Sequence, residues 1–336
     1  MEGARGLVAV IGAGPAGAMA AHLLARKGRE VLLLDDCRRS PDRMEMVPPG
    51  AAIALRAAGV GALLSHPEVA VPCLGILRKG AEDRQDFLSQ PGGSGFAIHR
   101  PTLDAAIRTA AVAAGAHLLR GRLAAIEDLG NRFEIRLTAT TRGSASIEAQ
   151  TVIDASGRAA VVGRRLGGKI TTWQHLIAEP VISDEGNDSW LCFSGGPDEW
   201  RYTMTGPGGR RDSWRVVVPI RGRKRSNVVD ASARSLAPTA GPRWLAIGDA
   251  ACAFDPICCQ GLANAAGTAL AAVGMIVQSG TVVESAAQAY SLACELVVSS
   301  TEMGRRGIYE KMRCIDLTED QRPTAPAQIL ETKGPA

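Results

Sequence analysis

Aromatic residues are scarce in this chain and make up only 4% of its 336 positions. Alanine and glycine are abundant instead, and small residues favour close packing of helices on strands and close approach of the backbone to a ligand. An excess of one charge is also lacking, because the net charge is only +4 at pH 7, which gives no case for nucleic acid as a partner. None of the eight cysteines forms a C-x-x-C pair or has zinc-ligand spacing, so the sequence predicts no metal site.

No secretory signal is evident, because the N-terminus runs directly into a strand pattern. We therefore expect a cytoplasmic protein with reduced thiols. Apart from residues 261–280, which carry no charge and are long enough to cross a bilayer, no segment suggests a membrane protein. The alanine-rich composition of this stretch and its polar members Asn264, Thr268 and Gln278 predict a buried helix of a soluble domain, without stable membrane insertion.

The first 35 residues follow the pattern of a β-α-β unit. Residues 7–11 are a continuous apolar run that suits a buried parallel strand, and residues 15–27 have helical composition ended by Gly28. A second apolar strand, residues 30–34, stops at Asp35. Strand, turn, helix, strand and acid follow one another in the order of a dinucleotide-binding domain.

The turn between the first strand and its helix reads Gly12-Ala13-Gly14-Pro15-Ala16-Gly17. Gly12 permits the tight turn, Gly14 lets the backbone approach a pyrophosphate, and Gly17 lets the helix pack against the strand. The helix N-terminus offers N–H groups and the positive end of its dipole to phosphates. This motif predicts a nucleotide site, with Asp35 on the ribose, but it does not separate FAD from NAD.

Two later segments narrow the choice of nucleotide. Residues 151–158 are an apolar strand that ends in the turn Asp154-Ala155-Ser156-Gly157. A later strand runs into Gly248-Asp249, and Pro256 and Gln260-Gly261 follow at the start of the long apolar helix. A carboxylate in such a turn can bind a ribityl chain. A helix N-terminus can lie under a flavin pyrimidine, where negative charge develops on reduction.

These blocks resemble the FAD-dependent monooxygenases of the p-hydroxybenzoate hydroxylase fold, which include flavin-dependent halogenases and geranylgeranyl reductase-like proteins. Within this superfamily, the chain is most similar to flavoproteins that mature quinone-cofactor amine oxidases and dehydrogenases by hydroxylating a tryptophan of a partner polypeptide. The resemblance spans about residues 5–315, and its matching stretches are residues 43–49, 98–100, 103–104, 154–158, 200–202 and 248–261.

The resemblance implies roles for individual residues. The implied cofactor-binding residues are Gly12, Gly14, Pro15, Ala16, Gly17, Asp35, Arg100, Asp154, Gly248, Asp249, Pro256 and Gly261, and the implied neighbours of the flavin ring are Pro256, Gln260 and Gly261. Two alternatives stay open: Arg100 reaches the cofactor or only starts a helix, and Asp154 binds the cofactor or only forms a turn. No catalytic side chain is predicted, because the flavin carries the chemistry.

The predicted fold is α/β, a Rossmann-type FAD-binding domain with an inserted antiparallel-sheet substrate lobe and a helical C-terminus. Short alternating segments in residues 169–229, punctuated by tryptophan, glycine and proline, predict the antiparallel sheet. The proposed division is an FAD-binding domain of residues 1–70, 98–168 and 240–282, a substrate lobe of 71–97 and 169–239, a helical segment of 283–320 and a tail of 321–336.

The function implied by the resemblance is that of an FAD-dependent monooxygenase. It would act through a flavin C4a-hydroperoxide on an electron-rich aromatic substrate, either a small molecule or a tryptophan of a partner peptide. Only one dinucleotide fingerprint is present, so NAD(P)H would bind transiently or a separate reductase would supply the electrons. Two alternatives stay open: a flavin-dependent halogenase or prenyl reductase, and a non-catalytic flavin-fold protein that binds a partner protein.

The chain departs from the family pattern in several places. Cys258-Cys259 replaces two serines common before Gln-Gly, and these thiols are either redox active or small residues in a tight turn. Residues 214–219 keep the first tryptophan and the proline of a halogenase segment but lose its second tryptophan, and the surroundings of Lys79 do not match those of the halogenase lysine. The basic run 221–225 suits a solvated loop, an acidic partner peptide or a nucleotide phosphate.

Overall fold

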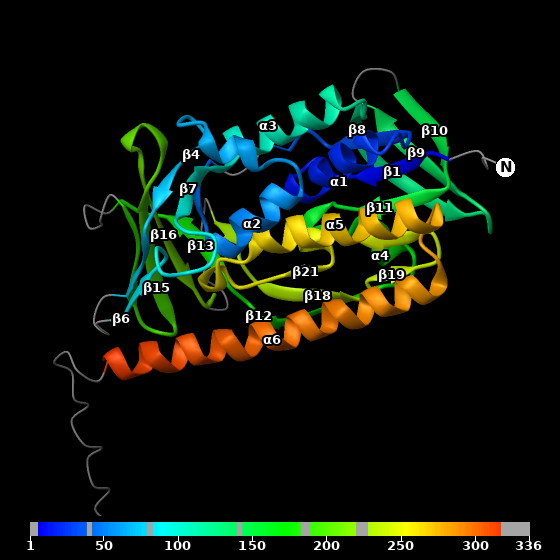
Figure 1. The fold of residues 1–336 in the computed structure, drawn as a ribbon. Coiled ribbons are helices and arrows are strands. Elements are labelled where there is room, and N and C mark those ends of the chain that lie inside the picture. Colours follow the sequence, from blue (N-terminus) through cyan, green and yellow to red (C-terminus); the bar gives the residue numbers. More distant parts are fainter. Residues whose placement is uncertain are drawn as a thin grey trace, which may run out of the picture.

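The computed structural model describes residues 6–38, 42–78, 83–139, 143–182, 189–219 and 228–316. Lys79, the basic run 221–225 and the tail 321–336 lie outside these described residues. Figure 1 shows an elongated molecule with one sheet toward each end and a long helix along one side.

An eight-stranded sheet forms the core of the N-terminal unit. In spatial order, its strands are β10 (Gly143–Ala149), β9 (Phe133–Ala139), β8 (His117–Asp128), β2 (Val31–Asp35), β1 (Val8–Ile11), β11 (Thr151–Asp154), β20 (Trp244–Ala246) and β19 (Ala240–Gly241). The five strands from β8 to β20 are parallel, and the edge strands pair antiparallel. Because β1 and β11 are buried along their whole length, both have continuous apolar sequences.

Helices pack around this sheet (Figure 1). They are α1 (Pro15–Arg26), α2 (Pro49–Ala57), α3 (Arg100–Ala113), the short α4 (Val161–Arg165) and α5 (Gly261–Ser279). α1 contacts both α3 and α5, and α5 also contacts α2. In the part of the chain that the structure describes, α5 is the one helix long and apolar enough to cross a membrane. Here α5 lies in the hydrophobic core, where α1 and α2 cover its buried face.

A seven-stranded sheet forms the second unit. In spatial order, its strands are β17 (Val229–Asp230), β13 (Ile177–Pro180), β16 (Arg211–Val217), β15 (Glu199–Thr205), β14 (Trp190–Gly195), β5 (Gly75–Arg78) and β6 (Asp83–Asp86). The predicted antiparallel sheet is confirmed, with one exception: β14 pairs in parallel with β5. Trp200 and Trp214 are buried in the apolar core of this unit.

Two three-stranded sheets connect the units. One consists of β3 (Met44–Val47), β7 (Gly95–His99) and β4 (Ala70–Cys73), and the other consists of β12 (Lys169–Gln174), β18 (Ala233–Ala237) and β21 (Cys252–Ala253). β7 leads directly into α3, and β21 leads into the loop before α5. The boundaries of the two predicted domains stay a prediction.

The helical C-terminus is confirmed as a single helix, α6 (Glu284–Asp316), of 33 residues. Figure 1 shows α6 running along the molecule from the β19 end of the first sheet toward the second sheet. Near its start, the Tyr290 hydroxyl donates a hydrogen bond to the carbonyl oxygen of Ala246, at 2.7 Å. This bond fixes the beginning of α6 to the end of β20.

Candidate functional site

The turn between β1 and α1 has the geometry that its glycines predict. Gly12 has a φ of +116°, and a Cβ there would lie 2.2 Å from the carbonyl oxygen of Ala155. A Cβ at Gly17 would lie 1.9 Å from the Gly12 oxygen, so both glycines let α1 pack closely on the sheet. A Cβ at Gly14, in contrast, would meet nothing within 4 Å, because Gly14 lines a pocket.

This pocket, of about 500 Å³, lies at the carboxyl ends of β1, β11 and β20. The turn after each strand contributes to its lining: residues 14–16, 155–159 and 247–249. These turns meet because the three strands are parallel neighbours. A Cβ at Gly248 would lie only 2.8 Å from the Cβ of Ala16. The glycine turn and the late Gly-Asp turn therefore border one cavity, as the sequence predicts.

The start of α1 fits an anionic group. Gly14 is the N-cap and gives no side-chain cap, so the first amides of the helix have no partner from a capping side chain. Amides in this position, together with the positive end of the helix dipole, bind phosphate groups. The described residues thus fit the diphosphate of a dinucleotide at the place where the sequence puts it.

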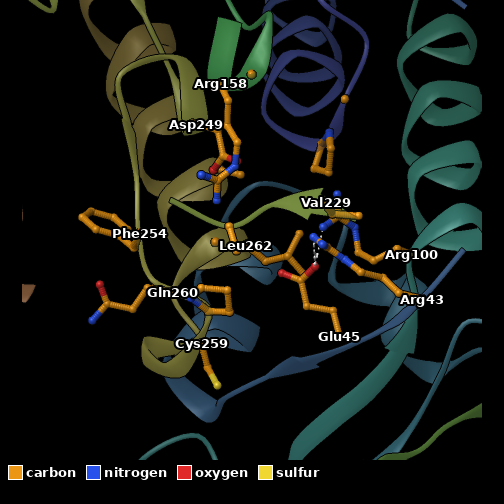
Figure 2. A pocket seen from close by; sticks show the side chains of 18 of the residues that line it. Arg43, Glu45, Arg100, Arg158, Val229, Asp249, Phe254, Cys259, Gln260 and Leu262 are labelled. Atoms are coloured by element: carbon orange, nitrogen blue, oxygen red, sulfur yellow. Dashed lines mark hydrogen bonds and ion pairs between the residues drawn. The ribbon is translucent and has the colours of Figure 1, made fainter. Parts of the chain in front are cut away.

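An ion pair forms one wall of the pocket, as Figure 2 shows. Arg158 follows the turn after β11, and its Nε lies 3.6 Å from Oδ2 of Asp249. Arg158 also donates a hydrogen bond to the carbonyl oxygen of Ser232. The Asp249 side chain remains 39% exposed, so its carboxylate can accept hydrogen bonds from a polyol such as a ribityl chain.

A cluster of charges lies across the pocket from this pair. Arg100, at the start of α3, pairs with Glu45 of β3 and, at 3.2 Å, with Asp104. Arg43 also donates to Glu45, at 3.3 Å, and Figure 2 shows both arginines pointing toward this carboxylate. Burial raises the pKa of Glu45, but the charges of Arg100 and Arg43 outweigh burial and hold that pKa below its usual value. Positive and negative charges are therefore balanced within the cluster.

The loop between β21 and α5 forms another side of the pocket. Pro256, Cys259 and Gln260 line it, and Cys259 has a left-handed φ of +52°. Neither Cys258 nor Cys259 is in a disulfide. Burial raises the pKa of Cys259 to about 12 and also raises the pKa of Cys258, so both are thiols rather than reactive thiolates near neutral pH.

The remaining wall is apolar and comes mainly from the second sheet. Its side chains, from β3, β14 and β15, are Met44, Met46, Leu191, Phe193, Tyr202 and Met204. The rings of Phe193 and Tyr202 lie 6.3 Å apart and are tilted by 53°. This wall faces the same cavity as the glycine turn, so a ligand ring bound there would lie beside the nucleotide site.

The predicted role of Asp154 in binding the cofactor needs correction, because the structure does not place Asp154 at the pocket. It is fully buried, and its carboxylate accepts hydrogen bonds from the backbone amides of Ser156, Val162 and Gly163, at 2.8–3.0 Å. Burial raises the pKa of this carboxyl group, and these hydrogen bonds oppose the rise. Asp154 therefore holds the turn after β11, which is the alternative role that the sequence left open.

Asp35 lies at the end of β2 in a second, more open recess with Arg108 and Arg120. Its carboxylate accepts a hydrogen bond from the amide of Cys37, at 2.9 Å. Arg38 lines both the recess and the main pocket, so the two are adjacent. This position suits the ribose end of an extended dinucleotide, and binding there stays a prediction.

No role was predicted for Arg43, Glu45 or Arg158, although all three lie within matching stretches. Arg158 had a local signal, because it follows the small-residue turn after β11. No local signal in the sequence indicates the pairing of Glu45 with Arg100, because the two residues come from separate elements 55 positions apart. The other predicted residues of the late segments, from Gly248 to Gly261, lie together at the pocket.

Known proteins resemble the chain in sequence and in fold. The chain is 30% identical to the menaquinone reductase of Mycobacterium tuberculosis (strain ATCC 25618 / H37Rv) over 194 residues, which cover 55% of this chain and 46% of that protein. It thus spans about half the length of this relative. Its fold is similar to that of the p-nitrophenol 4-monooxygenase PnpA from Pseudomonas putida DLL-E4, with a TM-score of 0.71 and 17% identity over 94% of both chains.

The fold is also similar to that of the peptidyl tryptophan dihydroxylase QhpG, with a TM-score of 0.68 and 20% identity over 91% of this chain and 75% of that chain. A family model described as an FAD binding domain matches residues 6–236. This match covers more than half of the chain and includes the glycine turn, Glu45, Arg100 and Arg158. The chain therefore belongs to the FAD binding domain family.

Proposed function

We propose that the chain is an FAD-dependent monooxygenase that hydroxylates an uncharged, electron-rich aromatic ring. The ring belongs to a small molecule or to a tryptophan of a partner peptide. The observation that carries the proposal is that one pocket is lined both by the glycine turn, which suits a dinucleotide, and by an apolar, aromatic wall. FAD, when bound, supplies the activation of O₂, and the protein positions the substrate and excludes water.

The residues around the first half of the pocket would hold FAD. The free amides at the start of α1 suit its diphosphate, and Asp249 suits its ribityl hydroxyls. Pro256 and Gln260 would border the ring, with Gly261 placing the positive end of α5 toward it. Electrons would come from NAD(P)H or from a separate reductase, and a cytoplasmic location stays a prediction.

The second half of the pocket favours a substrate without charge. The arginines that line the pocket as a whole are Arg38, Arg43, Arg100 and Arg158, and each already pairs with a carboxylate of the described chain. These ion pairs already neutralise the positive charge that would attract a substrate carboxylate. The hydroxyl of Tyr202 shows no hydrogen bond to any residue that the structure describes, so it can bind a hydroxyl or N–H group on the ring.

The test uses FAD-loaded protein that has been reduced without oxygen and is then mixed with ¹⁸O₂. Phenols, indoles and a tryptophan-containing peptide serve as substrates, and benzoates serve as charged counterparts. We expect one ¹⁸O atom in the product of an uncharged ring, and Tyr202→Phe should raise the KM for hydroxylated rings. Release of all consumed O₂ as hydrogen peroxide with every ring would contradict the proposal.

A second candidate function is reduction of a quinone or of a prenyl double bond. The observation that favours it is the 30% identity to a protein named menaquinone reductase. The apolar wall of Leu191, Phe193 and Met204 also suits a quinone ring or a prenyl chain. Turnover of menaquinone by the reduced protein without oxygen, and no oxygen transfer in the first test, would favour this candidate.

A further inference from the structure

Two hydroxyl groups of α6 reach the loop that borders the predicted flavin-ring site. The Thr301 hydroxyl donates a hydrogen bond to the side-chain oxygen of Gln260, at 2.8 Å. The Tyr309 hydroxyl donates to Oδ2 of Asp255, also at 2.8 Å. Asp255 and Gln260 are the two ends of the loop that precedes α5, so α6 contacts this loop at both ends.

The spacing of the two hydroxyl groups along α6 allows one helix to hold both ends of the loop. Residues 301 and 309 are eight positions apart, which places them about two helical turns, or roughly 12 Å, apart along the axis. Both are buried, Thr301 at 8% and Tyr309 at 6% exposed. One rigid helix therefore fixes the distance between the ends of the loop.

The contact at Asp255 is part of a buried chain of hydrogen bonds. Trp200 Nε1 donates to the Tyr309 hydroxyl at 3.0 Å, and this hydroxyl donates onward to Asp255. The other oxygen of Asp255 accepts from the amide of Ile257, at 3.0 Å, and so shapes the turn at Pro256. Because Asp255 is only 2% exposed, water cannot readily replace a lost donor, and each missing bond leaves a buried polar group unsatisfied.

We propose that Thr301 and Tyr309 are positioning residues that hold the loop 255–260 in the shape that receives the flavin ring. The matched family segment ends at residue 236, so neither the loop nor α6 belongs to it. The inference concerns binding of FAD and goes beyond the proposed monooxygenase reaction.

The experiment compares Tyr309→Phe and Thr301→Val with a matched control, Tyr290→Phe. Tyr290 lies on the same helix, is 7% exposed, and donates to the Ala246 carbonyl oxygen at the end of β20 rather than to the loop. The control thus loses the same atom and also loosens α6. The readouts are the Kd for FAD, by titration of the apoprotein, and hydrogen–deuterium exchange of the peptide that contains the loop.

We expect Tyr309→Phe to raise the Kd for FAD about tenfold, which corresponds to about 1.4 kcal/mol, and Thr301→Val to raise it about threefold. Both should speed amide exchange in the loop of the apoprotein. Tyr290→Phe should change the Kd by less than about twofold, although it too lowers the melting temperature.

The proposal is overturned if both test variants bind FAD as the parent does, or if Tyr290→Phe weakens FAD binding equally. In the second case α6 stabilises the whole fold without positioning the loop. If Tyr309→Phe does not fold, Thr301→Val decides the question by itself. Because neither readout requires a substrate or turnover, failure of the monooxygenase proposal leaves this test unaffected.

Discussion

One added methyl group at Gly17 and one at Gly14 should damage different properties of the protein. In Gly17→Ala, the new Cβ would lie 1.9 Å from the Gly12 carbonyl oxygen and 2.8 Å from the Cβ of Ala155. Neither neighbour can rotate away, so α1 has to move off the sheet. Overpacking of this kind costs about 3 kcal/mol, which lowers the melting temperature of a chain of this length by roughly 4 °C.

In Gly14→Ala, the new Cβ meets nothing within 4 Å, and a φ of −71° with a ψ of −177° is allowed for alanine. The apoprotein should therefore be as stable as the parent or slightly more stable. The methyl group points to the side from which a diphosphate would approach. We expect the Kd for FAD to rise at least about tenfold, or about 1.4 kcal/mol.

The assay compares thermal melts of the two apoproteins with a titration of each with FAD. Binding in the titration is monitored by the quenching of flavin fluorescence. Gly17→Ala should melt at a lower temperature than the parent, and Gly14→Ala should bind FAD with a higher Kd. If Gly14→Ala binds FAD with the parent Kd, the diphosphate does not lie at this turn. If Gly17→Ala melts with the parent, the close packing of α1 on β1 is not required.

The remaining predictions concern charge and thiols. Because Arg100 and Arg43 keep the pKa of Glu45 below its usual 4.5 despite burial, this pairing stabilises the fold above about pH 4.5 and is lost as the pH falls through the lowered value. Glu45→Gln should lower the free energy of unfolding by about 3 kcal/mol at pH 7. In urea titrations at several pH values, this variant should also lose less stability than the parent as the pH falls below 4.5, and an equal loss would contradict the prediction. Iodoacetamide should label the exposed Cys37 before Cys259, and equal labelling in peptide mass spectra would argue against a buried thiol. Asp154→Asn should cost about 2 kcal/mol of stability, whereas a large loss of FAD affinity in a protein of parental stability would restore Asp154 as a ligand.

The β-α-β start could be predicted from sequence because its signals are local. Gly12 and Gly17 are within six positions of each other, and the contact that each glycine permits is made within the same unit or with its neighbouring strand. The same holds for the Gly-Asp turn, since the carboxyl ends of parallel strands meet at one edge of a sheet. Pattern and spacing, together with the resemblance to FAD-dependent monooxygenases, were therefore enough to predict that the two turns border one pocket.

The rest depends on contacts between elements that periodicity does not reveal. The bond from Tyr309 to Asp255 joins residues 54 positions apart, and nothing in either segment signals the other. Asp154 shows a different limit, because an aspartate at a strand end suits a ligand and a turn equally well. Only its burial and its three backbone donors decide between the two roles.

The strand order separates the predicted cofactor site from the proposed substrate wall. From β1 the chain turns to β2 and β8 on one side of the sheet, while β11 and β20 lie on the other side. When the connections from two neighbouring strands run in opposite directions along a sheet, a crevice opens at the carboxyl ends of these two strands. Here the two strands are β1 and β11. That crevice lies at the end of the first sheet, whereas Phe193 and Tyr202 come from the second sheet. Substitutions at these two residues should therefore change which ring is accepted while leaving the dinucleotide site intact.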